Sequence, residues 1–150
     1  MIAVDSSVLV DVLAADPRFA DSSEASLGRA LAEGDVVICD AVVAEIHTLL
    51  EGAEATMESL ASLGIRYLPT SEPAAVRAGY MQRRFRDRGG RRERVVADFL
   101  IGAHALMQCD ALITRDAAFF RDYFKGLKVI EPKARRGKGR PTCKTSGETP

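Results

Sequence analysis

Residues 2–10 read Ile-Ala-Val-Asp-Ser-Ser-Val-Leu-Val, and this stretch decides which fold the chain adopts. Its first three residues are wholly apolar, which is typical of a short strand that is buried on both faces of a sheet. Ser6 and Ser7 suit the start of a helix that extends to about Ala14. A buried strand that leads directly into a helix predicts an α/β protein with a parallel sheet.

The same pairing of apolar strand and helix recurs along the chain. Short apolar runs predict further strands at residues 36–39, 65–68, 111–114 and 128–130. Periodic segments predict helices at about residues 22–33, 40–51, 53–63, 72–86 and 92–107, and a short helix from about Ala117. We therefore expect a three-layer α/β/α sandwich with a central, mostly parallel five-stranded sheet.

Composition indicates a single globular domain. The chain has 150 residues, of which 47% are hydrophobic and 28% are charged, and this length suits one well-cored domain. No run of about 18 apolar residues is present, and the N-terminal residues lack the pattern of a signal peptide, so we expect a cytoplasmic protein. The three cysteines are odd in number and widely spaced, which argues against a disulfide framework and against a zinc clamp.

The formal net charge of zero conceals an uneven distribution of charge. Residues 1–132 hold 15 Lys and Arg against 20 Asp and Glu, whereas residues 133–150 hold 6 against 1. The last stretch has almost no large apolar residue and is rich in Gly, Pro, Ser and Thr, so it cannot bury enough surface to order itself. We expect one folded domain over residues 1–132 and a basic, disordered tail over residues 133–150.

Four acidic residues occupy suggestive places in this pattern. Asp5 and Asp116 each follow a predicted strand, and in open parallel sheets the ligand site lies beyond the carboxyl ends of the strands. On helical wheels, Glu45 and Asp98 border the apolar faces of their helices, where a carboxylate loses hydration and needs a partner. Together, clustered carboxylate oxygens predict a site for Mg²⁺ or Mn²⁺.

Each of these acids also has a structural interpretation. Asp5 and Asp116 would be helix N-caps, and Glu45 and Asp98 would pair with some of the many arginines. Asp40 adds a further carboxylate whose place relative to the others is left open.

The helix predicted over about residues 92–107 is expected to turn Val95 and Val96 inward, together with the other apolar residues of its face. His47 and His104, the only histidines, do not share a helix face with Glu45 and Asp98, and both are expected at a helix surface or a core edge. A zinc hydrolase and a histidine-based nucleophile are therefore disfavoured. No glycine-rich phosphate loop appears either.

Four segments, taken in order, resemble the PIN-domain ribonucleases, and among these the VapC toxins of VapBC toxin–antitoxin modules most closely. They read Ile-Ala-Val-Asp-Ser-Ser-Val-Leu-Val from residue 2, Val-Val-Ala-Glu-Ile from residue 42, Val-Ala-Asp-Phe-Leu-Ile-Gly-Ala-His-Ala from residue 96, and Leu-Ile-Thr-Arg-Asp-Ala-Ala-Phe-Phe from residue 112. The likeness covers about residues 1–132 and leaves only the tail outside.

The resemblance implies metal-dependent cleavage of RNA by the acid quartet. Asp5 and Asp98 would bind Mg²⁺ or Mn²⁺ directly, with Glu45 and Asp116 completing the shell, often through water. The small hydroxyl residues beside them would be Ser7 and Thr114. Such proteins usually form homodimers and are inhibited by a VapB-like antitoxin.

A cluster of seven arginines lies between residues 83 and 94, and it forms either a solvated helix end or a surface for a phosphate backbone. The residues expected to position RNA are Arg84, Arg86, Arg88, Arg91 and Arg92. The leading hypothesis is thus a metal-dependent endoribonuclease that acts as a toxin. The alternative is a non-catalytic PIN-like module that binds RNA or a partner. A haloacid-dehalogenase-like phosphatase built on Asp5 is disfavoured, because Ser7 stands where that family has a second aspartate.

Overall fold

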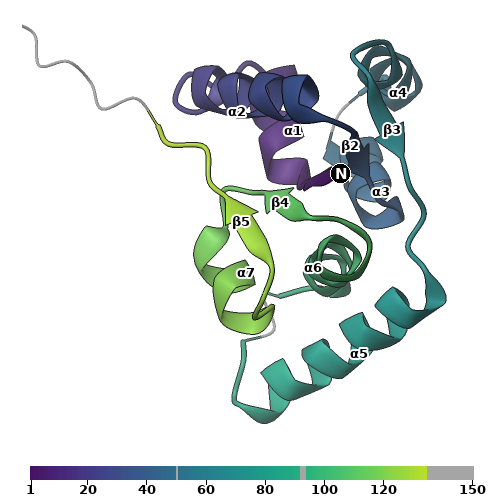
Figure 1. Cartoon of the computed structure of the whole chain (residues 1–150), viewed down its shortest axis with the longest axis vertical. Coiled ribbons are helices and arrows are strands. Elements are labelled where there is room, and N and C mark those ends of the chain that lie inside the picture. The colour runs from purple at the N-terminus through teal and green to yellow at the C-terminus, as the bar shows by residue number, and fades with distance from the viewer. Residues whose placement is uncertain (50, 92–93, 135–150) are drawn as a thin grey trace, which may run out of the picture.

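A five-stranded parallel sheet forms the centre of the molecule (Figure 1). The computed structural model describes residues 1–49, 51–91 and 94–134. The strands are β1 (Ile2–Val4), β2 (Val36–Ile38), β3 (Ile65–Tyr67), β4 (Ala111–Ile113) and β5 (Lys128–Ile130). They lie in the order β3-β2-β1-β4-β5, and every neighbouring pair is parallel. The predicted sheet is confirmed, and it is parallel throughout.

Helices cover both faces of this sheet. They are α1 (Ser6–Leu13), α2 (Ala20–Glu33), α3 (Asp40–Leu49), α4 (Ala53–Ser62), α5 (Glu72–Asp87), α6 (Val96–Gln108) and α7 (Ala117–Tyr123). In Figure 1, α1 and α2 lie together on one side of the sheet, and α5 and α6 lie on the other. The predicted three-layer α/β/α arrangement is therefore confirmed.

The three inner strands are buried along their whole length. Every residue of β1, β2 and β4 is buried, as their wholly apolar sequences predict. The edge strand β3 buries only Ile65 and leaves Arg66 and Tyr67 exposed. This difference follows the position in the sheet, since a central strand is covered by helices on both faces and an edge strand is not.

The register of the sheet places two polar residues beside each other. Val4 at the end of β1 pairs with Ile113 at the end of β4. The next residues along these strands are Asp5 and Thr114, and the N–H of Asp5 donates to the carbonyl of Ile113 at 2.9 Å. The carboxyl edge of the sheet thus begins with an aspartate next to a threonine.

Helix α6 begins later than the sequence pattern predicts. We expected it from about residue 92, but it begins at Val96, because Val95 has an extended backbone with ψ of 165°. The N–H of Val95 donates to the Asp98 carboxylate at 3.2 Å, and the N–H of Asp98 donates to the Val95 carbonyl at 3.2 Å. The expectation that Val95 and Val96 point inward is wrong, since they are 53% and 52% exposed.

His104 also differs from its expected place at a helix surface or core edge. Its side chain is 1% exposed and lies within the core. Burial lowers the pKa of this imidazole, with only a partial opposing effect from a hydrogen bond to the Leu68 backbone, so it is held in the neutral form. Within the described residues its Nε2 atom has no hydrogen-bond partner.

The predicted tail and the expected lack of a membrane span can be compared with the structure only over the described residues. Most of the basic tail falls in residues 135–150, which lie outside them, so the division at residue 132 stays a prediction. In the part of the chain that is described, no helix combines the length and the apolar character needed to cross a membrane.

The close packing of α6 against Phe124 gives a test of the fold. A Cβ atom at Gly102 would lie 2.3 Å from a carbon of the Phe124 ring, and this ring is buried. We expect Gly102→Ala to lower the free energy of unfolding by about 1–3 kcal/mol, because overpacking forces neighbouring groups apart. Urea unfolding followed by circular dichroism measures this difference.

Gly79→Ala is the matched control, because Gly79 is also helical but has no atom within 4 Å of its would-be Cβ. Alanine should stabilise that position by about 0.5–1 kcal/mol, since glycine is the poorer helix former. Equal effects of the two substitutions would contradict the packing described for Gly102.

Candidate active site

Asp5 is the buried centre of the polar edge. Its residue is 7% exposed, and its Oδ2 atom accepts hydrogen bonds from the Ser7 hydroxyl at 2.9 Å and the Thr114 hydroxyl at 2.6 Å. Asp5 stands at the N-cap position of α1, but its side chain makes no capping hydrogen bond. Asp5 therefore occupies the N-cap position that the structural interpretation gave it, but its carboxylate does not cap the helix and is instead oriented by the hydroxyls of Ser7 and Thr114.

Glu45 reaches the same edge from helix α3. It is half-buried and accepts a short hydrogen bond from the Ser6 hydroxyl, which also lies 3.4 Å from Oδ1 of Asp5. Burial raises the pKa of Glu45, and the negative charges of Asp5 and Asp98 act in the same direction against the Ser6 hydrogen bond. Ser6 was predicted only as the start of a helix, so its role as a bridge between two acids was missed.

Asp98 lies in the first turn of α6, and its side chain is 24% exposed. Burial raises its pKa, and the charges of Asp5 and Asp116 add to this effect, although the Arg94 guanidinium and the Val95 N–H oppose it. The net shift is upward, which means that the surroundings of Asp98 disfavour its negative charge even with an arginine beside it.

Arg94 connects the two remaining acids. One guanidinium nitrogen forms a short ion pair with Asp116 and lies 3.7 Å from the carboxylate of Asp98. The guanidinium also lies over the Phe119 ring, 4.0 Å from its centroid. Asp98 therefore has the arginine partner that the structural interpretation expected, whereas Glu45 pairs with a serine.

Asp116 occupies the N-cap position of α7 without capping it through its side chain. Its N–H donates to the Thr114 hydroxyl at 3.1 Å. Asp5 and Asp116 are thus both joined to Thr114, one through its side chain and the other through its backbone.

The structure brings all four predicted acids into one connected group. Hydrogen bonds and ion pairs link neighbours in the order Glu45, Ser6, Asp5, Thr114, Asp116, Arg94 and Asp98. The group combines the carboxyl ends of β1 and β4 with the helices α3 and α6. This is the edge of the sheet at which the sequence predicted a ligand site.

The chemistry of this group suits a hard divalent cation. Carboxylate and hydroxyl oxygens are the donors that Mg²⁺ and Mn²⁺ prefer, and Arg94 already places a positive charge between two of the acids as a stand-in. Among the residues that the structure describes, no three Asp, Glu, His or Cys side chains are arranged to hold a metal ion. The residue types thus fit a cation, whereas the positions of these side chains do not form a metal site, so Asp5 and Asp98 as direct ligands stay a prediction.

Asp40, whose place the sequence left open, is occupied elsewhere. Its two carboxylate oxygens accept hydrogen bonds from the Tyr67 hydroxyl at 2.7 Å and the Thr70 N–H at 3.0 Å. Burial alone would raise the pKa of Asp40, but hydrogen bonds from Thr70 and Tyr67 outweigh it and lower the pKa. Asp40 ties α3 to β3 and the segment after it.

An ion pair between a buried acid and a partly exposed arginine, beside the site, was missed from the sequence. The Arg115 guanidinium donates to Asp11 at 2.9 Å, and the Ser23 hydroxyl donates to the same carboxylate at 2.7 Å. Asp11 is 1% exposed, and the Arg115 guanidinium also packs over the Phe19 ring. Because Arg115 lies between Thr114 and Asp116, this pair fixes the segment that carries both. A charged residue on the inner face of α1 is the sequence signal that could have revealed it.

The predicted RNA-positioning arginines separate into different surroundings. Arg86 and Arg91 line a hollow of about 610 Å³ together with Arg94. The guanidinium of Arg84 lies 5.8 Å from the centre of the Tyr80 ring, and Arg88 is the exposed C-cap of α5. Arg92 lies outside the described residues. The structure therefore places two of the five beside the arginine that contacts the acids.

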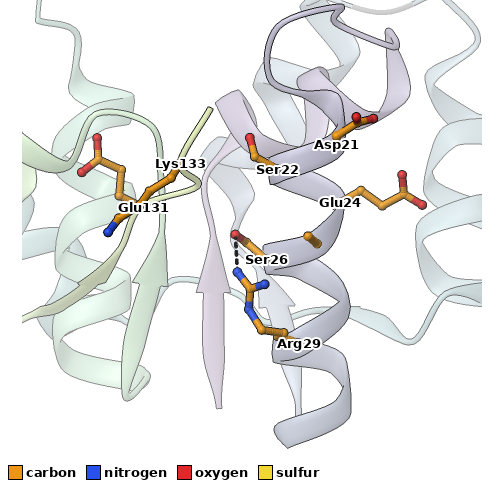
Figure 2. Close-up of a pocket in the computed structure, with 8 residues that line it drawn as sticks. Asp21, Ser22, Glu24, Ser26, Arg29, Glu131 and Lys133 are labelled. Carbon is orange, nitrogen blue, oxygen red and sulfur yellow. Dashed lines mark hydrogen bonds between the residues drawn. The ribbon is translucent and has the colours of Figure 1, made fainter. Parts of the chain in front are cut away.

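A second hollow, of about 770 Å³, lies between α2 and the segment after β5 (Figure 2). Residues of both charge signs line it, including Glu24, Arg29, Glu131 and Lys133, and Arg29 donates to the Ser26 hydroxyl at 3.2 Å. None of the four linked acids borders this hollow, so it is separate from the candidate active site.

The fold and the site define a three-layer α/β/α protein with an acidic centre at the carboxyl edge of its sheet. The family model described as the PIN domain matches residues 2–125. The chain therefore belongs to the PIN domain family, as its sequence motifs indicated. A comparison with curated protein sequences found no match.

Solved structures named VapBC and FitAB contain chains of similar structure. VapBC2 from Rickettsia felis bound to promoter DNA matches with a TM-score of 0.68 and 19% identity, over 89% of this chain and 100% of that one. FitAB bound to a DNA fragment matches with a TM-score of 0.64 and 26% identity, over 88% and 95%. DNA-bound VapBC from Salmonella typhimurium matches with a TM-score of 0.66 and 14% identity, over 88% of this chain and 98% of that one. At 14% and 19% identity, the likeness shows a shared fold.

The raised pKa of Glu45 predicts how stability without metal depends on pH. A carboxyl group whose pKa is raised by folding stabilises the folded state below its ordinary value of 4.5, and this contribution is lost as the pH rises through the higher folded value. Glu45→Gln should therefore raise the Tm at pH 7 in EDTA by about 2 °C, and the gain should shrink as the pH falls towards 4.5. Thermal unfolding at several pH values measures it.

Glu58→Gln provides the matched control, because Glu58 is exposed on α4. Its Tm should differ little from that of the unaltered protein across the same range. A lower Tm for Glu45→Gln at pH 7 would show that its charge stabilises the site rather than straining it.

Proposed function

We propose that this protein is a Mg²⁺- or Mn²⁺-dependent endoribonuclease that acts as the toxin of a toxin–antitoxin pair. The observation that carries the proposal is the linked group of four acids at the carboxyl edge of β1 and β4. Membership of the PIN domain family supports it. The reaction would be hydrolysis of phosphodiester bonds in RNA.

A bound divalent cation would neutralise charge on the phosphate and lower the pKa of a water molecule. Asp5 and Asp98 would hold the ion, and Glu45 and Asp116 would complete its shell through water. Ser7 and Thr114 keep the Asp5 carboxylate in a fixed orientation, so this ligand would not need to be ordered when the ion binds. Burial raises the pKa of Glu45, which makes its carboxylate a stronger base than that of an exposed glutamate.

RNA would enter from the side of the arginine-lined hollow. Arg86, Arg91 and Arg94 line it, and the contact of Arg94 with Asp98 and Asp116 joins it to the acids. Phosphate groups would therefore meet positive charge before they reach the acidic centre. Arg84 and Arg88 would add to the attraction at longer range. Arg92 belongs to the same proposed set but lies outside the described residues.

The partners in the proposal follow the matched structures. The chains of similar fold come from complexes named VapBC and FitAB, and one match is titled as a toxin–antitoxin complex. By analogy, this protein would bind a VapB-like antitoxin. A homodimer and action in the cytoplasm are further parts of the proposal, and they rest on the sequence alone.

Loss of either inner acid is expected to abolish cleavage. Asp5→Asn and Asp98→Asn should each lower Mn²⁺-stimulated RNA cleavage by about 100-fold or more, since each removes a charged ligand of the ion. Cleavage of a labelled RNA with Mn²⁺ or with EDTA measures this, and circular dichroism checks the fold. Asp40→Asn is the matched control, because the oxygens of Asp40 are bonded to Tyr67 and Thr70. Full activity of both site variants would refute the proposal.

A non-catalytic PIN-like module that binds RNA or a partner is the second candidate. The ion pairs of Arg94 favour it, because an internal cation neutralises Asp98 and Asp116 without any metal. This candidate requires that the purified protein binds RNA and leaves it uncut at millimolar Mn²⁺. Cleavage that depends on Asp5 would exclude it.

The hollow predicts which arginines carry the salt dependence of RNA binding. Arg86→Ala and Arg91→Ala should each reduce the slope of log K against log salt by about 0.7, the value for one phosphate contact on a single strand. Binding is measured in an Asp5→Asn background so that the RNA stays intact. Arg18→Ala, which removes an exposed arginine just before α2, should leave the slope unchanged. An unchanged slope in all three variants would remove the hollow from RNA binding.

A further inference from the structure

Arg94 engages oxygen atoms that the proposed metal ion also needs. Its guanidinium contacts Oδ2 of Asp116 and lies 3.7 Å from Oδ1 of Asp98. The other oxygen of Asp98, Oδ2, accepts the hydrogen bond from the Val95 N–H. Both oxygens of Asp98 therefore already have partners within the protein.

These two partners of Asp98 differ in how easily they can leave. The Val95 N–H belongs to the backbone at the start of α6, and its position follows from the helix itself. The Arg94 guanidinium stands at the end of a long side chain that is 30% exposed and can rotate about several bonds. An incoming cation would therefore displace the arginine and leave the backbone contact in place.

The Phe119 ring supports Arg94 independently of the acids. The guanidinium lies 4.0 Å from the centroid of this ring, and the ring is buried in a group of aromatic residues. A cation–π contact adds to the two ion pairs and orders the side chain in the site. Arg94 is thus a positioned counter-ion rather than a surface side chain that reaches the acids by chance.

We propose that Arg94 is the resident counter-ion of the acid site, and that a divalent cation must displace its guanidinium from Asp98 and Asp116 in order to bind. The inference rests on the metal site of the proposed function and adds a competition between the metal and a residue of this chain. Removing Arg94 therefore strengthens metal binding, although it also removes a stabilising ion pair from the metal-free protein.

Mn²⁺ affinity of the full chain tests this competition. Isothermal titration calorimetry with Mn²⁺ is carried out on the unaltered protein, on Arg94→Ala and on Arg86→Ala. We expect Arg94→Ala to bind Mn²⁺ about fivefold more tightly, the change that corresponds to one partly exposed ion pair. Arg86→Ala is the matched control, because Arg86 lines the same hollow but forms no ion pair among the described residues. Its affinity should change much less.

Thermal unfolding supplies a second measurement that does not depend on activity. Metal-free Arg94→Ala should have a lower Tm than the unaltered protein, because its acids repel one another without a counter-ion. Addition of Mn²⁺ should then raise the Tm of Arg94→Ala by more than it raises the Tm of the unaltered protein. If alanine prevents folding, Arg94→Gln removes the charge while keeping much of the side chain, and the same two measurements apply to it.

Three results would overturn the inference. They are an unchanged or weaker Mn²⁺ affinity in the Arg94 variants, an equal gain in Arg86→Ala, and no binding of Mn²⁺ by any variant. The last result would also refute the proposed metal-dependent function, whereas the first two leave that function intact. Tight Mn²⁺ binding that is weakened by Asp5→Asn but accompanied by no RNA cleavage would refute the nuclease and leave the role of Arg94 standing.

Discussion

The hydrogen bond between Thr114 and Asp5 is the contact on which the site depends. It joins the first residues beyond β1 and β4, which the parallel register places side by side. Parallel pairing makes neighbouring strands end at the same edge, so an acid and a hydroxyl that are far apart in sequence meet without a loop to bring them together. Glu45 and Asp98 then approach this fixed point from α3 and α6. The geometry of the site therefore depends on the register of β1 and β4.

The site also works against the stability of the fold. Glu45 and Asp98 both have raised pKa values because burial and neighbouring negative charges disfavour their ionised forms. The Ser6 hydroxyl at Glu45, and the Arg94 guanidinium and the Val95 N–H at Asp98, reduce this strain without removing it. Local conflict of this kind is expected where a protein keeps charged groups together for a function instead of for folding.

The fold and the four acids could be predicted from the sequence, whereas several contacts around the acids could not. The strands were predictable because apolar triplets followed by helices have few other interpretations, and Asp5 and Asp116 followed from their places after strands. Arg94 was missed as a partner because the pattern extended α6 through it, whereas the Asp98 carboxylate starts the helix after Val95. His104 was misplaced for a similar reason, since one helical wheel does not show which neighbours cover a polar side chain. The pairing of Asp11 with Arg115 joins distant parts of the chain, and periodicity can show that an acid faces inward but cannot identify its partner.

This pairing of Asp11 with Arg115 has a consequence for how the sequence can vary. Asp11 is almost completely buried, so replacing Arg115 alone would leave its carboxylate inside the protein with the Ser23 hydroxyl as its remaining partner, and this would destabilise the fold. Replacing both residues with apolar side chains of similar volume would avoid that penalty. The two positions are therefore coupled, and replacing both should cost less stability than the sum of the two single replacements. Arg115 stands between Thr114 and Asp116. Substitution of Asp11 on α1 is therefore constrained by a residue that belongs to the segment carrying the site.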